Sequence, residues 1–184
     1  MKKIIRIGFP NKPAKIGGPA TFQNNLSKFL RSNSFTVCNN INKNVDCIIV
    51  ISSTSKIFSL IKCKLKNIKI IHRLDGINYK PLSKVGNLRL FIYFRLVNIL
   101  MSFIRRYLAD YIIYQSKFTE DWWNESYGKI KSPSKIIYNG TYEIINNKAK
   151  AENYEIICIE GNYNEKENLE LIEQVYLNLN KKKA

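Results

Sequence analysis

The sequence contains a single histidine, His72, and its four cysteines show no CxxC spacing. Structural and catalytic metal sites usually combine several His and Cys ligands, so this composition argues against a bound metal ion. Ser116 is not expected to be a hydrolase nucleophile, because the sequence has no second histidine to act as its triad partner. Scattered thiols are typical of reduced, mostly buried cysteines in a cytoplasmic protein. We therefore expect neither a metal nor any other cofactor.

Long uncharged apolar runs and the common nucleotide-binding loops are also missing. The longest apolar region, residues 88–113, is interrupted by four arginines and falls short of the ~18 residues of a spanning helix. The first ten residues are too short and too charged for a signal peptide. Neither GxGxxG nor a Walker loop is present, which argues against dinucleotide and P-loop chemistry. We expect a cytoplasmic protein, either soluble or peripheral at the inner face of the cytoplasmic membrane.

Acidic residues are scarce, and their distribution is uneven. The net charge is +16, and 26 of the 30 Lys and Arg residues lie before residue 151, together with only half of the 14 Asp and Glu residues. An excess of cations favours anionic partners such as nucleic acid, an acidic membrane or phosphate-bearing substrates. The alternative is that many lysines merely solvate the surface. The change of sign near Lys150 indicates a domain boundary.

Short β-rich runs alternate with helical patterns, which predicts an α/β, Rossmann-like parallel sheet with helices on both faces. The strands are expected at 4–9, 35–37, 45–51, 68–71, 111–114 and 135–138. The helices are expected from Pro19, over 56–64, 88–108 and 117–127. We expect one such domain over residues 1–145, a linker over 146–153, and a short β–α start of a second domain over 154–184.

Unusual polar and glycine residues follow the predicted strands, at the edge where open α/β sheets bind ligands. Gly17 and Gly18 follow the first strand and precede a helix, where backbone N–H groups can face an anion. The alternative is an ordinary tight turn. Ser116 follows the fifth strand and is a candidate ligand contact or a helix N-cap. Asn139 and Gly140 follow the sixth, as a candidate contact or a simple strand exit.

The segment His72, Arg73 and Asp75 is predicted to follow the fourth strand and carries the most chemistry. A neutral imidazole can hydrogen-bond a sugar hydroxyl, the guanidinium can hold a phosphate, and the carboxylate can accept a hydroxyl proton. His72 and Asp75 are therefore the candidate catalytic residues. The alternative is a loop held together by a local Arg–Asp pair.

Four segments in this order resemble the N-terminal domain of glycosyltransferase family 4, of the GT-B fold, and its bacterial surface-polysaccharide members in particular. They read IGFPNKPAKIGGPATF, IIHRLDGI, LADYIIYQSKFTEDWW and KIIYNG, and the likeness covers about residues 3–145. The resemblance implies hexosyl transfer from a nucleoside-diphosphate sugar to a lipid-linked glycan acceptor. It also implies that Gly17 and Gly18 lie near the donor phosphates, that His72 contacts the transferred sugar, and that no metal is required.

The second domain departs from the family pattern. The family places a Gly-Arg pair and a downstream lysine against the donor diphosphate, whereas Asn162 stands at the arginine position and Lys166 is the one match. The later stretch with two glutamates is absent. The resemblance thus implies a truncated enzyme, inactive or weakly active alone and completed by a separate chain that carries the donor domain.

Two other functions stay open on the sequence. The chain fits a non-catalytic remnant or subunit that needs a partner, and it also fits a basic module that binds nucleic acid or a membrane. No RRM, KH or helix-turn-helix pattern appears, which argues against nucleic acid. The helix at 88–108 carries Arg89, Arg95, Arg105 and Arg106 on a broad apolar surface. It suits either an anionic bilayer surface or a core helix with a few solvated arginines.

Overall fold

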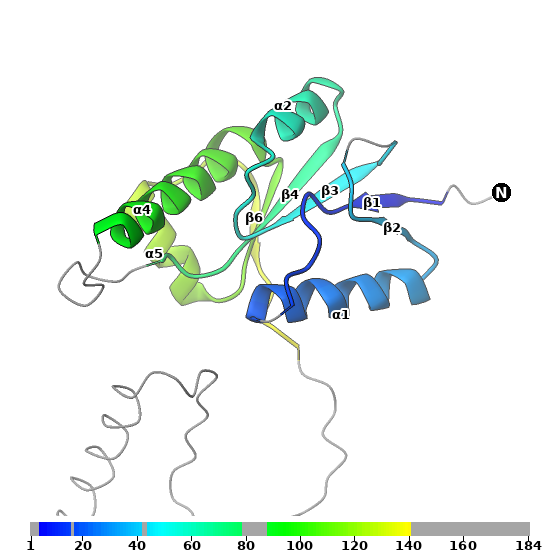
Figure 1. Ribbon diagram of the computed structural model, residues 1–184, viewed down its shortest axis with the longest axis horizontal. Helices are drawn as coiled ribbons and strands as arrows, with labels where there is room; N and C mark the ends of the chain where they lie inside the picture. The colour runs from blue at the N-terminus through cyan, green and yellow to red at the C-terminus, as the bar shows by residue number, and fades with distance from the viewer. Residues whose placement is uncertain (1–3, 16, 42–43, 79–87, 141–184) are drawn as a thin grey trace, which may run out of the picture. The chain divides into compact units, whose positions relative to one another are not determined.

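Six parallel strands form one sheet in the order β2-β1-β3-β4-β5-β6 (Figure 1). This computed structural model describes residues 4–15, 17–41, 44–78 and 88–140. The described residues belong to one compact unit, Met1–Gly140. The sheet and its helices confirm the predicted α/β, Rossmann-like fold. The expected linker and β–α unit over 146–184 lie outside the described residues.

The strands lie where the sequence predicts them, with shifts of a few residues at their ends. Their bounds are β1 Arg6–Gly8, β2 Thr36–Cys38, β3 Cys47–Ile51, β4 Lys69–Leu74, β5 Tyr111–Tyr114 and β6 Ser134–Ile136. The central strands β3, β4 and β5 are rich in isoleucine, as expected for parallel strands covered by helices. The chain leaves β1 toward β2 on one side and later toward β3 on the other. This reversal creates a topological switch point between β1 and β3.

Helices cover both faces of the sheet. Their bounds are α1 Gly18–Ser32, α2 Ile57–Leu65, α4 Leu88–Phe103, the π-helix η1 Ile104–Leu108, and α5 Lys117–Tyr127. Helix α1 lies on the opposite side of the sheet from α2 and α4 (Figure 1). No helix among the described residues is long and apolar enough to cross a bilayer.

The alternation of side chains along each strand divides the core into two layers. Ile7 of β1 and Phe9, which follows this strand, pack with Leu30 of α1, on the face that α1 covers. On the other face, Ile48 and Ile70 pack against η1, and Trp123 of α5 packs against Leu74, Ile112 and Tyr114. The same alternation places the neighbours His72 and Arg73 on opposite faces of β4. They therefore belong to different environments although they are adjacent in sequence.

The long predicted helix over 88–108 changes its hydrogen-bonding pattern near its end. It runs as an α-helix to Phe103 and continues as a π-helix through Leu108. Arg105 in this last turn is fully buried, and its guanidinium donates to the Tyr114 hydroxyl, the Gly128 carbonyl and the Asn124 side chain. Both sequence readings of this helix, arginines at a bilayer surface or solvated arginines on a core helix, are therefore wrong for Arg105. A buried guanidinium is tolerated here because three acceptors satisfy its donors.

Gly8 provides a test of the close packing between β1 and the segment that follows β2. A Cβ atom on Gly8 would lie 3.1 Å from Val45 Cγ1 and 3.2 Å from Ile41 Cγ2. We expect Gly8→Val to lower the free energy of unfolding by about 1–3 kcal/mol, because overpacking forces neighbours to shift. Urea denaturation measures this loss. Gly18→Ala is the control, since nothing lies within 4 Å of its Cβ position, and an equal loss in both variants would contradict the packing argument.

Candidate functional site

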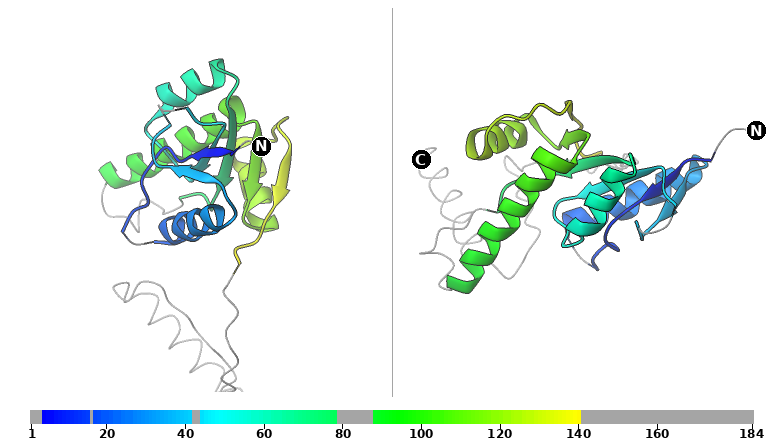
Figure 2. Two further views of the ribbon diagram at one scale, coloured as in Figure 1. Left: turned by 90° about the vertical axis from the view of Figure 1, so that its right-hand side faces the viewer. Right: turned by 90° about the horizontal axis from the view of Figure 1, so that it is seen from above.

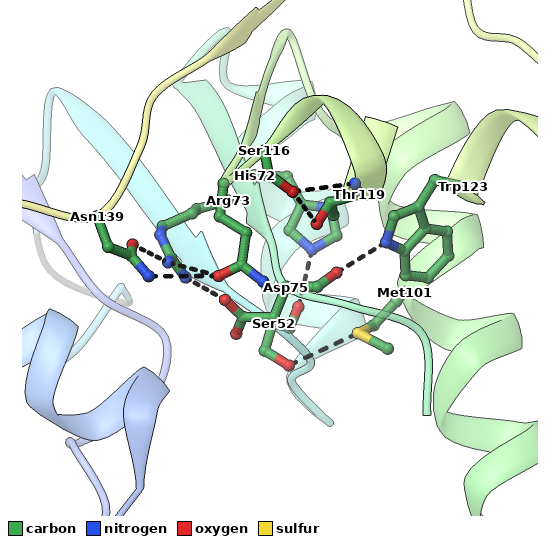
Figure 3. Close-up of polar contacts among 10 residues, drawn as sticks. Ser52, His72, Arg73, Asp75, Met101, Ser116, Thr119, Trp123 and Asn139 are labelled. Atoms are coloured by element: carbon green, nitrogen blue, oxygen red, sulfur yellow. Dashed lines mark hydrogen bonds and ion pairs between the residues drawn. The ribbon is translucent and has the colours of Figure 1, made fainter. Parts of the chain in front are cut away.

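The side chain of Arg73 joins four segments at the carboxyl edge of the sheet. Its guanidinium pairs with Asp75 and donates to the side-chain oxygen of Asn139 at 2.7 Å and that of Gln115 at 3.4 Å. It also lies 3.8 Å from the centre of the Phe22 ring of α1. Figure 3 shows Arg73 between Asn139 and Asp75. The ends of β4, β5 and β6 and the first helix are thus held by one cation.

The prediction that His72 and Arg73 lie in a loop after the fourth strand is wrong. Strand β4 continues through Leu74, with Val50 paired to His72 and Leu74 paired to Tyr114. Polar residues can extend a buried strand when their side chains find partners. Arg73 is 2% exposed and has such partners, so the sheet pairing does not stop at the first polar residue.

His72 has no exposed surface, and its environment fixes its chemical form. Its Nε2 donates to the Ser52 carbonyl oxygen at 2.7 Å, so the proton lies on Nε2 and Nδ1 is an acceptor. Ser52 adopts a φ of 56°, a conformation that is uncommon for residues other than glycine. The pKa of His72 is lowered to about 4. Burial is the main cause and the charge of Arg105 adds to it, while the hydrogen bond to the Ser52 carbonyl opposes the shift. The imidazole is neutral at pH 7.

Two acceptors at the end of β4 are buried without a donor among the described residues: His72 Nδ1 and Asp75 Oδ2. The Asp75 side chain is 21% exposed, and its other oxygen pairs with Arg73. Its backbone carbonyl accepts from Trp123 Nε1 at 2.8 Å, which holds the main chain at Asp75 (Figure 3). A buried acceptor without a donor is costly, so Asp75 is suited to a ligand that supplies a hydroxyl.

A small pocket of about 180 Å³ lies at the switch point between β1 and β3. Its walls include Pro10, Asn11 and Lys12 after β1, Ser52 and Ser53 after β3, and the first turns of α1. Two bonds shape the pocket: Gln23 donates to the Asn11 carbonyl, and Asn11 donates to the Ser53 carbonyl. Typical small-molecule sites occupy roughly 300–1,000 Å³, so this pocket has room for a single phosphate or part of a sugar.

Three other predicted site residues, Gly17, Gly18 and Ser116, lie at the starts of helices. Gly17 has a φ of 112° and is the N-cap of α1, so a glycine is required at this turn. Gly18 opens the helix one residue earlier than predicted. Ser116 is the predicted N-cap of α5, since its hydroxyl accepts from the Thr119 amide. None of the described contacts joins Gly17, Gly18 or Ser116 to Arg73.

Asn139 and Gly140 are the last two described residues, and only Asn139 makes a described contact with the site. Asn139 is part of the Arg73 cluster. The described contacts assign no partner to Gly140, and nothing lies within 4 Å of its Cβ position. Lys166 lies outside the described residues. The sequence predicts that Gly18, His72 and Asp75 converge at the carboxyl edge. In the structure Arg73 joins Asp75 and Asn139 there, whereas no described contact joins Gly18 to Asp75 and the His72 side chain is buried in the opposite layer.

Sequence reasoning missed Phe22 and Lys12 as parts of this edge. Phe22 has the spacing of an ordinary apolar residue of its helix, and an aromatic ring under a guanidinium leaves no separate signal in a single sequence. Lys12 was one of many lysines. Among the described residues, no group of three His, Cys, Asp or Glu side chains could hold a metal ion.

No protein-family model, no curated protein and no solved structure matches the chain.

The titration of His72 tests the described environment directly, because it is the only histidine. The folded pKa of about 4 lies below the usual 6.5. The unfolded chain therefore takes up the proton first, and stability present above pH 6.5 is lost as the pH falls toward 4. The predicted loss is about 3 kcal/mol. Proton NMR of the single imidazole should show no titration down to about pH 4, and a midpoint near 6.5 would contradict its burial.

Proposed function

We propose that residues 4–140 form the acceptor-side domain of a nucleotide-sugar-dependent glycosyltransferase, acting on a glycan or lipid-linked saccharide in cell-surface polysaccharide synthesis. The proposal combines the resemblance of four sequence segments to glycosyltransferase family 4 with the chemistry of the carboxyl edge. The fold alone carries no function, since this sheet supports many reactions.

One observation supports the proposal: at the edge of a parallel sheet, the Asp75 carboxylate has one oxygen paired with Arg73 and a second, buried oxygen without a donor among the described residues. Sugars bind proteins mainly through hydroxyl groups, which donate hydrogen bonds to such oxygens. Arg73 holds the other oxygen of Asp75, and Trp123 holds its backbone. Because the carboxylate is held in place before a ligand arrives, little ordering is required on binding.

In this reaction the acceptor hydroxyl forms a bond to the anomeric carbon of the donor, and the bond from that carbon to the diphosphate oxygen breaks. In this proposal Asp75 Oδ2 accepts the hydrogen bond, and then the proton, of the bound acceptor hydroxyl. The pocket beside Lys12 and the start of α1 suits a phosphate oxygen. His72 is assigned a positioning role, since its imidazole is covered and holds the Ser52 carbonyl at the pocket wall.

Binding measurements test the proposal on the full chain. Short saccharides and nucleoside-diphosphate sugars are titrated while backbone amide shifts are followed by NMR. We expect perturbations near Asp75 and Ser53, and we expect Asp75→Asn to weaken saccharide affinity about tenfold or more, because a hydrogen bond to a charged group is worth about 1.5–3 kcal/mol. Lys12→Gln should weaken binding of the nucleotide sugar but leave a phosphate-free saccharide unchanged.

The matched control is Asp121→Asn on α5, an exposed carboxylate that pairs with Lys117. This variant should bind as the wild type does. The proposal is rejected if no saccharide perturbs the edge, or if Asp75→Asn and Asp121→Asn have the same effect. Failure of Lys12→Gln alone would reject only the assignment of the phosphate to the pocket.

A further inference from the structure

Helix α4 has a second apolar surface that no described segment covers. Met101 and Asn98 face the core and are buried. On the outer side, large apolar side chains recur at helical spacing and are exposed: Leu88, Ile92, Leu96, Ile99 and Phe103. We call these five residues the outer stripe. Large exposed apolar patches usually mark interaction sites, so the outer stripe is a candidate docking surface.

The charges around the outer stripe are all of one sign. Residues 88–108 contain no Asp or Glu. At helical spacing Arg95 lies along one margin of the stripe and Arg89 along the other, and both are exposed. Tyr93 and Tyr107 are 59% and 63% exposed. Apolar residues in the middle, with arginines and tyrosines at the margins, are typical of a helix that lies in a membrane interface.

We propose that α4 docks on an anionic lipid bilayer, with the outer stripe among the acyl chains and Arg89 and Arg95 at the lipid phosphates. A second copy of this chain fits the surface less well, since pairing two such stripes brings arginines of like charge together. The helix follows β4, so its first turn starts from the carboxyl-edge side of the sheet. Figure 2 shows this end of α4 extending past the strands.

Membrane docking does not depend on the transferase proposal, because it requires no sugar. The full chain is incubated with vesicles of phosphatidylglycerol and phosphatidylcholine, or of phosphatidylcholine alone, and bound protein is separated by flotation. We expect binding to the anionic vesicles that weakens as salt is raised. Leu96→Gln with Ile99→Gln should lower the partition coefficient about tenfold or more. Arg95→Gln should lower it about fivefold.

Matched controls lie on α1, on the other face of the sheet. Phe29 is 62% exposed and Leu96 is 59% exposed, so Phe29→Gln removes a comparable apolar surface. Arg31→Gln removes one exposed cation. Both variants should float as the wild type does, and thermal melts should show that all the variants are folded.

Three results would overturn the proposal. The first is equal flotation on both kinds of vesicle, or none on either. The second is a loss in Phe29→Gln as large as that in the Leu96 and Ile99 variant. The third is a concentration-dependent mass increase that the Leu96 and Ile99 substitutions abolish while flotation is unchanged, because the stripe would then be an interface between copies.

Discussion

The buried guanidinium of Arg73 is the constraint on which the arrangement of the carboxyl edge depends. An arginine that is 2% exposed is stable only when acceptors meet its donors, and here they come from three different strand ends. Displacing Asp75 would leave a buried charge unpaired, which costs about 3–5 kcal/mol, and displacing Gln115 or Asn139 would leave a guanidinium donor without its acceptor. The ring of Phe22 extends this constraint to α1.

The two faces of the sheet differ in chemistry at this edge, because Arg73 and His72 point to opposite sides of β4. On the α1 face Arg73 pairs with one oxygen of Asp75, and the other oxygen is buried without a donor among the described residues. On the opposite face His72 is kept neutral by burial and by the nearby charge of Arg105, and it holds the Ser52 carbonyl. The pocket between β1 and β3 adds a lysine and a helix start. A carboxylate and a pocket lined by a lysine therefore lie along this sheet edge, whereas the neutral imidazole is covered in the opposite layer.

Much of the fold could be predicted because strand and helix signals are local. Helix α5 begins and ends where the sequence indicates, with Ser116 as its cap. The positions of His72 and Arg73 could not be predicted, since a polar residue ends or extends a strand according to partners 20 to 66 residues away. The same holds for Arg105, whose burial depends on Tyr114 and Asn124. The apolar pattern of 88–108 left open which half of the helix is exposed, and only packing decides that.

Amide hydrogen exchange in the variant Arg73→Gln tests most directly whether this one side chain holds the edge together. The Ile137 amide donates to the Tyr114 carbonyl at 2.9 Å and reports on the end of β6, while Leu60 of α2 reports on the core. Arg6→Gln, which breaks the partly exposed pair with Asp46 at β1, is the control. Relative to the wild type, we predict that Arg73→Gln accelerates exchange at Ile137 more than at Leu60. We predict no such difference between the two accelerations in Arg6→Gln. Unchanged exchange at Ile137 in Arg73→Gln would contradict the account.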